Sequence, residues 1–264
     1  MIQLSYSPRV SNFVDAADVS GNIRNVPLYL QYLHQIDVAC KKADITTGAV
    51  YPIVGGTATS HSFNFLNPAQ YQVNWFGVVT HSSNGMQSDG TTGYGNTGIK
   101  TTQFNLSSGL MMGIYAYNTG TSGQRASIGA YSSSGGDTNS FQLRPFYNFT
   151  SSQTFSFGQF ITLVTSPIKG SQIANKIPNV NIRSLARNGI ELISDNTSLS
   201  NISINADIYI LCYNNNNPSL GTNTPSFFSN NTHGLFAITN GISSVLNTKI
   251  FSHDIYTANR SIGR

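Results

Sequence analysis

From about Asp44 onward the sequence is divided into short apolar segments, and their spacing limits the folds open to this chain more than any other feature does. The segments recur at intervals of roughly 10–20 residues, and Gly, Asn, Ser and Pro fill the gaps between them. The sequence lacks the alternation of strands with helices that would indicate a parallel sheet. The pattern therefore predicts a mainly-β fold, an antiparallel β-sandwich or barrel. The predicted strands are 62–66, 71–79, 99–105, 110–117, 126–131, 141–147, 160–165, 180–185, 190–194, 202–204, 208–213 and 235–238.

The first 44 residues follow a different pattern. Residues 1–25 carry two short apolar patches between polar links, which predicts an irregular arm that becomes ordered on a partner. A helix should follow, because Asn25 can cap it, Pro27 suits its first turn, and apolar residues recur on one face. That face consists of Tyr29, Leu33, Ile36 and Cys40. We expect two parts: an arm and short helix at 1–44 that dock and assemble the protein, and a β-sandwich at 45–264.

Local signals identify further elements. Asn188-Gly189 accepts the positive φ angles of a type I′ turn, so a hairpin is expected there. Ser243 or Ser244 can cap a C-terminal helix whose apolar edge would be formed by Leu246, Ile250, Phe251 and Ile255. The Asn run 214–217 is expected to be a loop. We expect Phe227-Phe228 to form a buried plug over the sandwich, and the alternative is an exposed contact patch.

The composition excludes several classes of function. Only 9% of residues are charged, and the net charge of +4 is spread along the chain without a concentrated basic patch, so nucleic-acid binding is not expected. The two cysteines, Cys40 and Cys212, are expected to be buried free thiols. No apolar run approaches the ~18 residues of a membrane span, and no signal peptide is evident at the start. These features fit synthesis in a reducing cytoplasm.

The sequence contains few residue patterns that are typical of catalytic or metal-binding sites. Glu191 is the single glutamate, and its nearest acid, Asp195, follows four residues later, so the paired carboxylates of a glycosidase are not evident. Four histidines lack the spacing of metal ligands, so we interpret them as hydrogen-bonding residues. They are His61, His81, His233 and His253. The sequence also lacks the G-x-S-x-G motif of a serine hydrolase. Asp89 and Asp137 lie in loops suited to calcium, but neither has an acidic neighbour. No catalytic, cofactor-binding or metal-binding residue is predicted, and the binding residues stay unassigned.

Several motifs occur in a fixed order from residue 51 to the C-terminus. They are 51–61 (YPIVGGTATSH), Phe63-Asn64, Asn67-Pro68, Thr80-His81, 89–97 (DGTTGYGNT), Arg187-Asn188-Gly189, 207–214 (DIYILCYN) and Ile262-Gly263-Arg264. In this order and spacing the chain resembles a family of bacteriophage virion proteins with a concanavalin A-like or laminin-G-like sandwich. It departs from the family at Leu211-Cys212, where a small Gly-Ala pair is usual, and its last helix lacks the usual acidic start.

The resemblance implies a non-enzymatic structural protein of the virion, in its tail, fibre, baseplate or head decoration. Within this reading we expect the N-terminal arm to contact other virion proteins, the chain to form a homo-oligomer by analogy with fibres and spikes, and exposed sandwich loops to be the place where host glycan could bind. Trp75 and Tyr94 could stack on sugar rings, but we expect both in the core. The working surface is expected in the arm and in the loops around Gly120, Gly135 and Asn215. Two alternatives stay open: a free or cell-surface lectin, and a polysaccharide depolymerase that uses Glu191 or Asp137.

Overall fold

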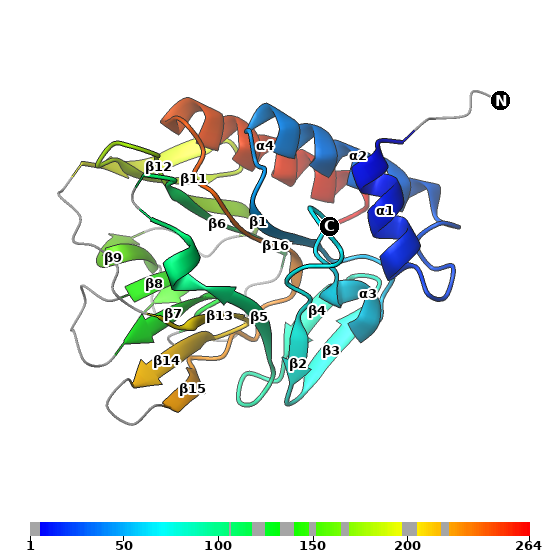
Figure 1. Ribbon diagram of the computed structural model, residues 1–264, viewed down its shortest axis with the longest axis horizontal. Helices are drawn as coiled ribbons and strands as arrows, with labels where there is room; N and C mark the ends of the chain where they lie inside the picture. The colour runs from blue at the N-terminus through cyan, green and yellow to red at the C-terminus, as the bar shows by residue number, and fades with distance from the viewer. Residues whose placement is uncertain are drawn as a thin grey trace.

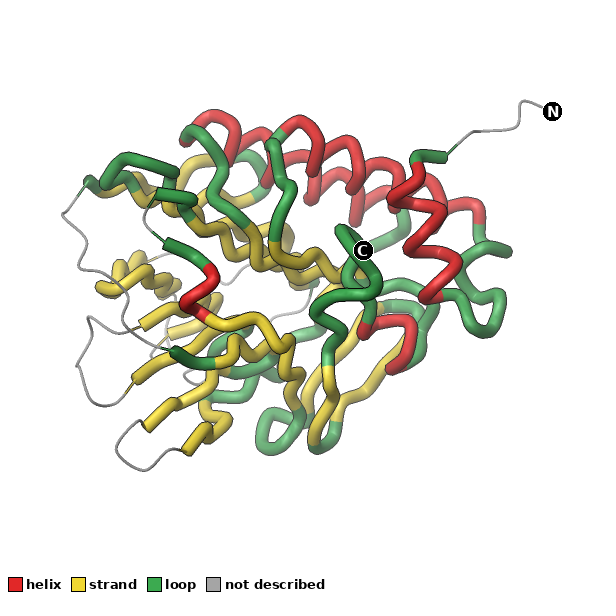
Figure 2. The backbone as a smooth tube through the Cα atoms, viewed as in Figure 1, coloured by secondary structure: helices red, strands yellow, loops and turns green. Residues whose placement is uncertain are grey.

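The computed structural model describes residues 6–105, 107–117, 125–132, 140–147, 152–164, 169–196, 205–217 and 222–264. The described chain forms three layers: a layer of helices, a first sheet beneath it, and a second sheet beneath the first (Figure 1). The tube in Figure 2 shows that strands dominate and that the long helices gather on one side. The predicted fold class, a mainly-β sandwich with helices near both ends of the chain, is confirmed.

The first sheet is antiparallel and has eight strands. Every residue of its three central strands, β6, β10 and β16, is buried, because another layer covers each face. In spatial order the strands are β12 (Ile190–Asp195), β11 (Arg183–Arg187), β10 (Gly170–Lys176), β6 (Leu110–Ala116), β16 (His233–Thr239), β4 (Gly85–Ser88) and β3 (Val79–Ser82), with β1 (Gly48–Pro52) also paired to β16.

The second sheet also has eight strands, and the pairing of β14 with β7 is parallel. This pairing arises because the chain reverses at Leu211, whose φ is +68°, so that β13 and β14 both reach β7. The strands are β15 (Thr222–Ser226), β14 (Tyr213–Asn217), β7 (Ile128–Ser132), β13 (Asp207–Ile210), β5 (Tyr94–Lys100) and β2 (Asn74–Phe76), with β8 (Ser140–Tyr147) on β7 and β9 (Ser152–Val164) on β8.

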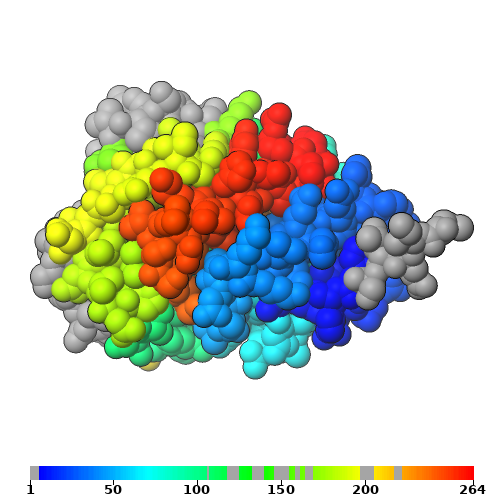
Figure 3. All heavy atoms as spheres, turned by 90° about the horizontal axis from the view of Figure 1, so that it is seen from above, coloured from blue at the N-terminus to red at the C-terminus, as the bar shows by residue number. Residues whose placement is uncertain are grey.

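The helix layer consists of α1 (Pro8–Ala17), α2 (Pro27–Lys42) and α4 (Val245–Ser261). Seen from above, α2 and α4 run side by side across this face of the molecule (Figure 3). The prediction of an irregular arm over 1–25 is wrong for Pro8–Ala17, because Ser7 accepts a hydrogen bond from the Val10 amide and caps a helix there. The ring of Phe13 in α1 packs edge-on against Phe65, with centroids 5.4 Å apart. Residues of the predicted arm therefore belong to the core.

Strand alternation separates two cores on the two faces of the first sheet. On β16, Leu235 and Ala237 contact the helix layer, whereas Phe236 and Ile238 point toward the second sheet. The second sheet turns Ile208 and Ile210 of β13 into the same inner core. Its opposite side, here called the outer face, has no described helix over it (Figure 1).

Several predicted elements are confirmed. The helix after Pro27, the C-terminal helix capped by Ser244, and the β11–β12 hairpin all form, the last with φ of +51° at Asn188 and +87° at Gly189. Val26, and not Asn25, precedes α2 as its N-cap residue. Both cysteines are buried free thiols. In the described part of the chain, no helix has the length and apolar character needed to cross a membrane.

Other predicted elements are wrong. The predicted strand 62–66 does not form: α3 (Ala58–Ser62), whose start is fixed by a capping box of Thr57 and Ser60, ends at Ser62, and residues 63–66 are loop. The predicted strand 71–79 breaks at Gly77, and 99–105 turns into the 3₁₀ turn η1 (Thr101–Gln103) after β5. The Asn run 214–217 is part of strand β14, and Leu246 of α4 is 62% exposed. The strands β1, β4, β10 and β15 were not predicted, and the predicted strand 202–204 lies outside the described residues.

Candidate functional site

The outer face of the second sheet carries a row of aromatic side chains across neighbouring strands. On β13, Tyr209 lies between the inward-facing Ile208 and Ile210, so its ring points outward. Its ring centroid lies 4.8 Å from that of Tyr94 on β5, and Tyr94 stacks on Phe76 of β2 at 5.0 Å with the planes 13° apart. Phe76 is 45% exposed, so one side of this stack is open to solvent. We call Phe76, Tyr94 and Tyr209 the first platform.

A second aromatic stack lies on the same face. Phe227 stacks on Tyr213 of β14 at 5.2 Å, and the Arg144 guanidinium lies over both rings, 4.9 Å and 5.1 Å from their centroids. Phe227 is 38% exposed and has a φ of +56°, a conformation that aromatic residues rarely adopt. The predicted buried plug is therefore wrong for Phe227, because the left-handed backbone turns its ring outward. We call Phe227, Tyr213 and Arg144 the second platform.

Phe228 and Arg125 connect the two platforms. The half-buried Phe228 ring lies 6.4 Å from Tyr94, edge to face. The Arg125 guanidinium donates to the carbonyl oxygens of Gly90 and Phe228 at 3.0 Å and 2.7 Å, which fixes the turn that carries Phe228. In the described chain no carboxylate forms an ion pair with Arg125.

Polar groups suited to recognition lie among these rings. The Gln142 side chain on β8 points to the outer face, since Phe141 and Leu143 point inward. Its Oε1 accepts from Arg144 Nε at 2.5 Å, while its buried Nε2 has no partner among the described residues. Burial raises the pKa of Tyr209 and of Tyr213 to about 12, so both hydroxyls stay protonated at neutral pH. The face thus presents two exposed rings, Phe76 and Phe227, whereas the neighbouring hydrogen-bonding groups Gln142, Tyr209 and Tyr213 and the cation Arg144 are buried.

The two aromatic residues named from the sequence fall on different faces. Trp75 is half-buried and packs toward the inner core, where its Nε1 donates to the Ala58 carbonyl at 2.9 Å. Tyr94 lies on the outer face, so the expectation that both are core residues holds for Trp75 and is wrong for Tyr94. The sequence analysis did not identify Phe76 as an outer-face residue, because it predicted one continuous strand over 71–79, whereas the break at Gly77 separates β2 from β3.

The acids considered for catalysis are not arranged as a glycosidase pair. Glu191 and Asp195 lie on opposite sides of β12, because its pairing with β11 shifts register between them. They are also four residues and so about 13 Å apart along the strand, beyond the ~5–9.5 Å between glycosidase carboxylates. Asp195 is also ion-paired with Arg183. Asp137 lies outside the described residues, as do Gly120 and Gly135.

The fold pairs two sets of residues that the sequence kept far apart. Ser127 Oγ lies 2.9 Å from His233 Nε2, and His61 Nδ1 lies 3.0 Å from His81 Nδ1. The Ser127–His233 pair resembles part of a hydrolase site, but both residues are fully buried, so a substrate has no access to them. The sequence gives no signal for the Ser127–His233 pair, because its two residues are 106 positions apart and belong to no local motif.

The Asp89 carboxylate already has several donors. It accepts hydrogen bonds from the amides of Thr91, Thr92 and Gly93 at 2.8–3.0 Å and from both threonine hydroxyls. Burial acts to raise the pKa of Asp89, but these donors hold it well below its usual range. Its oxygens shape the turn before Tyr94 and are not free to bind calcium. The described residues contain no group of three or more His, Cys, Asp or Glu that could hold a metal ion.

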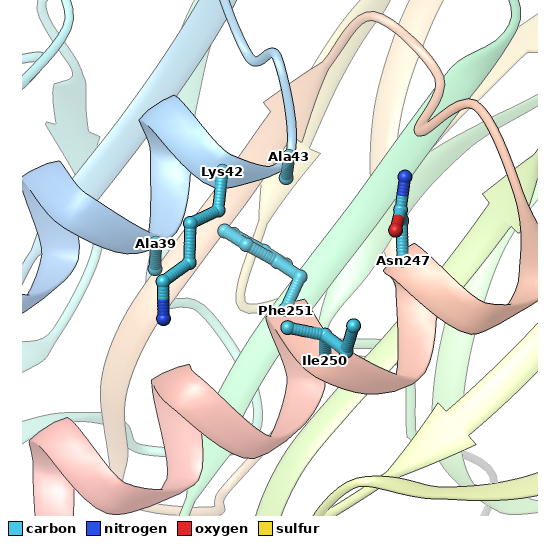
Figure 4. A pocket seen from close by; sticks show the side chains of 6 residues that line it. All are labelled: Ala39, Lys42, Ala43, Asn247, Ile250 and Phe251. Carbon is cyan, nitrogen blue, oxygen red and sulfur yellow. The ribbon is translucent and has the colours of Figure 1, made fainter.

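A groove between α2 and α4 is hollowed by two cavities of about 300 and 310 Å³. Figure 4 shows the first, with Ile250, Phe251 and Asn247 of α4 opposite Ala39 and Lys42 of α2 and the adjoining Ala43. Lys42 lines both cavities, and its salt bridge to Asp254 at 3.1 Å spans the groove. The charges of Lys42 and Asp254 in this groove are already engaged with each other, and neither cavity carries an exposed aromatic stack, so the groove is a weaker candidate than the outer face.

No family model matches the sequence, and the search of curated proteins finds no match. Among solved structures, domain 4 of AbnA, a GH43 extracellular arabinanase from Geobacillus stearothermophilus solved with arabinotriose, is similar with a TM-score of 0.52 and 9% identity, over 79% of this chain and 98% of that one. The Trypanosoma rangeli sialidase in complex with sialic acid has a TM-score of 0.51 and 11% identity, over 87% of this chain and 39% of that one. NanB sialidase from Streptococcus pneumoniae reaches 0.41 and 11% identity over 54% of this chain, which spans about a quarter of its length (23%). At these identities what the chain shares with the first two is the fold, a mainly-β sandwich.

Proposed function

We propose that this chain is a non-enzymatic, glycan-binding β-sandwich and a structural component of a bacteriophage particle. One observation carries the glycan-binding part: the exposed rings of Phe76 and Phe227, each stacked on a tyrosine, share the sheet face over which no described helix lies. Flat rings such as these can stack on the apolar faces of sugars, and exposed apolar patches on soluble proteins commonly mark binding sites. The fold similarity to an arabinanase domain solved with arabinotriose is consistent with this proposal.

The virion part rests on the ordered motifs between residue 51 and the C-terminus that resemble phage virion proteins. We place the contacts with other virion proteins, or with further copies of this chain, on the segment 1–44. Its helices belong to the core, but Val19 is 69% and Leu28 is 53% exposed, which leaves apolar surface for a neighbour. Particle proteomics tests this part: the chain should be present in purified particles, and a chain found free or only on cells would indicate the lectin alternative.

The non-enzymatic part rests on the separation of Glu191 from Asp195 and on the inaccessible Ser127–His233 pair. A depolymerase would release reducing ends from host polysaccharide. We expect no release by the purified chain, and no change on Glu191→Gln. Reducing ends that appear with the purified chain and disappear with Glu191→Gln would make the depolymerase alternative correct.

A glycan array followed by calorimetry with the best oligosaccharide tests binding. Phe76→Ala and Phe227→Ala should each weaken binding about 5–10-fold, because aromatic stacking contributes about 1 kcal/mol per ring. Leu246→Ala is the matched control, since Leu246 is an exposed apolar residue of the helix layer and should bind as the unaltered chain does. Equal losses in all three variants, or an array without any ligand, would contradict the proposal.

A further inference from the structure

A cluster of three rings joins the two sheets directly behind the first platform. His61 of α3 and His81 of β3 face each other through their Nδ1 atoms at 3.0 Å, and the Trp75 indole of β2 lies edge-on to the His81 ring at 4.9 Å. Because β2 belongs to the second sheet and β3 to the first, these contacts hold the chain where it crosses between sheets. Phe76, the exposed ring of the first platform, is the next residue after Trp75.

The geometry fixes where the protons lie. Two neutral imidazoles that face each other through one nitrogen each can share a single proton between them. The His61 ring is fully buried, and its Nε2 has no partner among the described residues. Nε2 is unsatisfied in either tautomer, but a buried N–H without an acceptor is the rarer defect, and a bare Nε2 also suits the positive charge of Arg264 that acts on His61. The low-energy arrangement is therefore His61 Nδ1–H donating to the bare Nδ1 of His81, with the His81 proton on Nε2.

Acid disrupts this arrangement. A proton added to His81 Nδ1 sets two N–H groups against each other, unless His61 moves its own proton to the unpartnered Nε2. Burial lowers the pKa of His81 to about 4. Burial, His81 and then Arg264 hold the pKa of His61 well below its ordinary value.

Among the described residues, Arg264 is a charged group that acts on His61, and its own contacts hold it in place. Its guanidinium donates to the carbonyls of Ile53, Ser83 and Gly234 and lies over the Tyr117 ring. A proton on the pair therefore adds a second positive charge near a fixed one.

We propose that His61 and His81 form an acid-sensitive latch, which opens on acidification, releases β2 and moves Phe76 off its stack on Tyr94. The consequence for binding rests on the proposed function: glycan affinity should fall as the latch opens. A transition-metal ion bound between the two Nδ1 atoms is the less favourable reading, because it would force the His61 proton onto the unpartnered Nε2.

Trp75 reports on the latch because it is the single tryptophan of the chain. Acrylamide quenching of its fluorescence is measured from pH 7.5 to 3.5, which passes through the pKa of His81, with circular dichroism to show that the fold persists. We expect the quenching constant to rise at least two-fold in the unaltered chain. His81→Asn keeps an acceptor near the Nδ1 position without titrating, so its quenching constant should stay flat. His34→Asn, at an exposed histidine on α2, should behave as the unaltered chain.

Unchanged quenching in the unaltered chain, or the same rise in His81→Asn, would overturn the latch. Should His81→Asn fail to fold, ¹⁵N NMR of the unaltered chain decides: the Nδ1–H tautomer of His61 supports the latch, and the Nε2–H tautomer refutes it. Glycan titrations at pH 7.5 and 3.5 separate the two proposals. If no glycan binds at pH 7.5, the proposed function is wrong, and the latch is then tested by fluorescence alone. If glycan affinity persists in acid while quenching rises, the latch opens but does not control glycan binding.

Discussion

At the scale of single residues, Phe227 shows a conflict between backbone preference and side-chain position. Its φ of +56° suits Asn or Gly, yet a large ring stands there, exposed and stacked on Tyr213. Phe227→Asn should therefore keep the melting temperature within a few degrees, because relief of backbone strain offsets the lost stacking, while glycan binding falls. Calorimetric melting and glycan titration check both effects. A large loss of stability with intact binding would mean that the ring serves packing and not recognition.

Asp89 is a residue-scale case in which one carboxylate organises a turn. Asp89→Ala leaves the amides of Thr91, Thr92 and Gly93 without their acceptor and should lower the free energy of unfolding by about 1–2 kcal/mol. Asp89→Asn keeps one acceptor oxygen and should lose about half as much. Urea unfolding measures both, and an unchanged midpoint in Asp89→Ala would show that the turn is held by other contacts.

At the scale of elements, the link between β2 and β3 depends on Gly77. Its φ is +62°, and a Cβ there would collide with the carbonyl oxygen of Thr92. Gly98 has a similar φ of +68° but nothing within 4 Å, so it isolates the cost of the backbone angle. Gly98→Ala should cost about 1 kcal/mol and Gly77→Ala clearly more, with reduced glycan binding because Phe76 precedes the link. Urea unfolding and glycan titration of both variants check this, and equal costs would mean that the close approach to Thr92 is readily relieved.

At the scale of the whole molecule, the helix layer is one face of a shared core. Val10, Phe13 and Val14 of α1 and Leu33 and Ile36 of α2 are buried. Deleting residues 1–44 should expose the apolar face of the first sheet and give aggregated or unfolded protein, and not the folded sandwich that the sequence alone suggested. Size-exclusion chromatography and circular dichroism test this, and a monomeric, cooperatively melting product would show that the division at residue 44 separates true domains.

Acid stability is a second property of the whole molecule. Burial lowers the pKa of His233 to about 3 and of His81 to about 4, and it holds that of His61 well below its ordinary value. Unfolded histidines take up protons near pH 6.5, so the unfolded state binds more protons below that pH. Stability should therefore fall as pH falls from about 6.5 toward 4. Thermal melts across this range check the sign, and a melting temperature that stays constant or rises in acid would contradict it.

The sequence by itself determined the features that depend on neighbours in the chain. Alternation and turn residues sufficed for the mainly-β class, the hairpin at Asn188-Gly189 and the two long helices, because each is fixed by local backbone preference and periodicity. The tertiary structure decided the rest. Trp75 and Tyr94, for example, lie on opposite faces of the second sheet. Period-two alternation predicts this only when the break at Gly77 and the pairing of β2 with β5 are already known. The outer-face platforms, the Ser127–His233 pair and the His61–His81 contact join residues that lie up to 151 positions apart, as Phe76 and Phe227 do, and only chain folding brings such residues together.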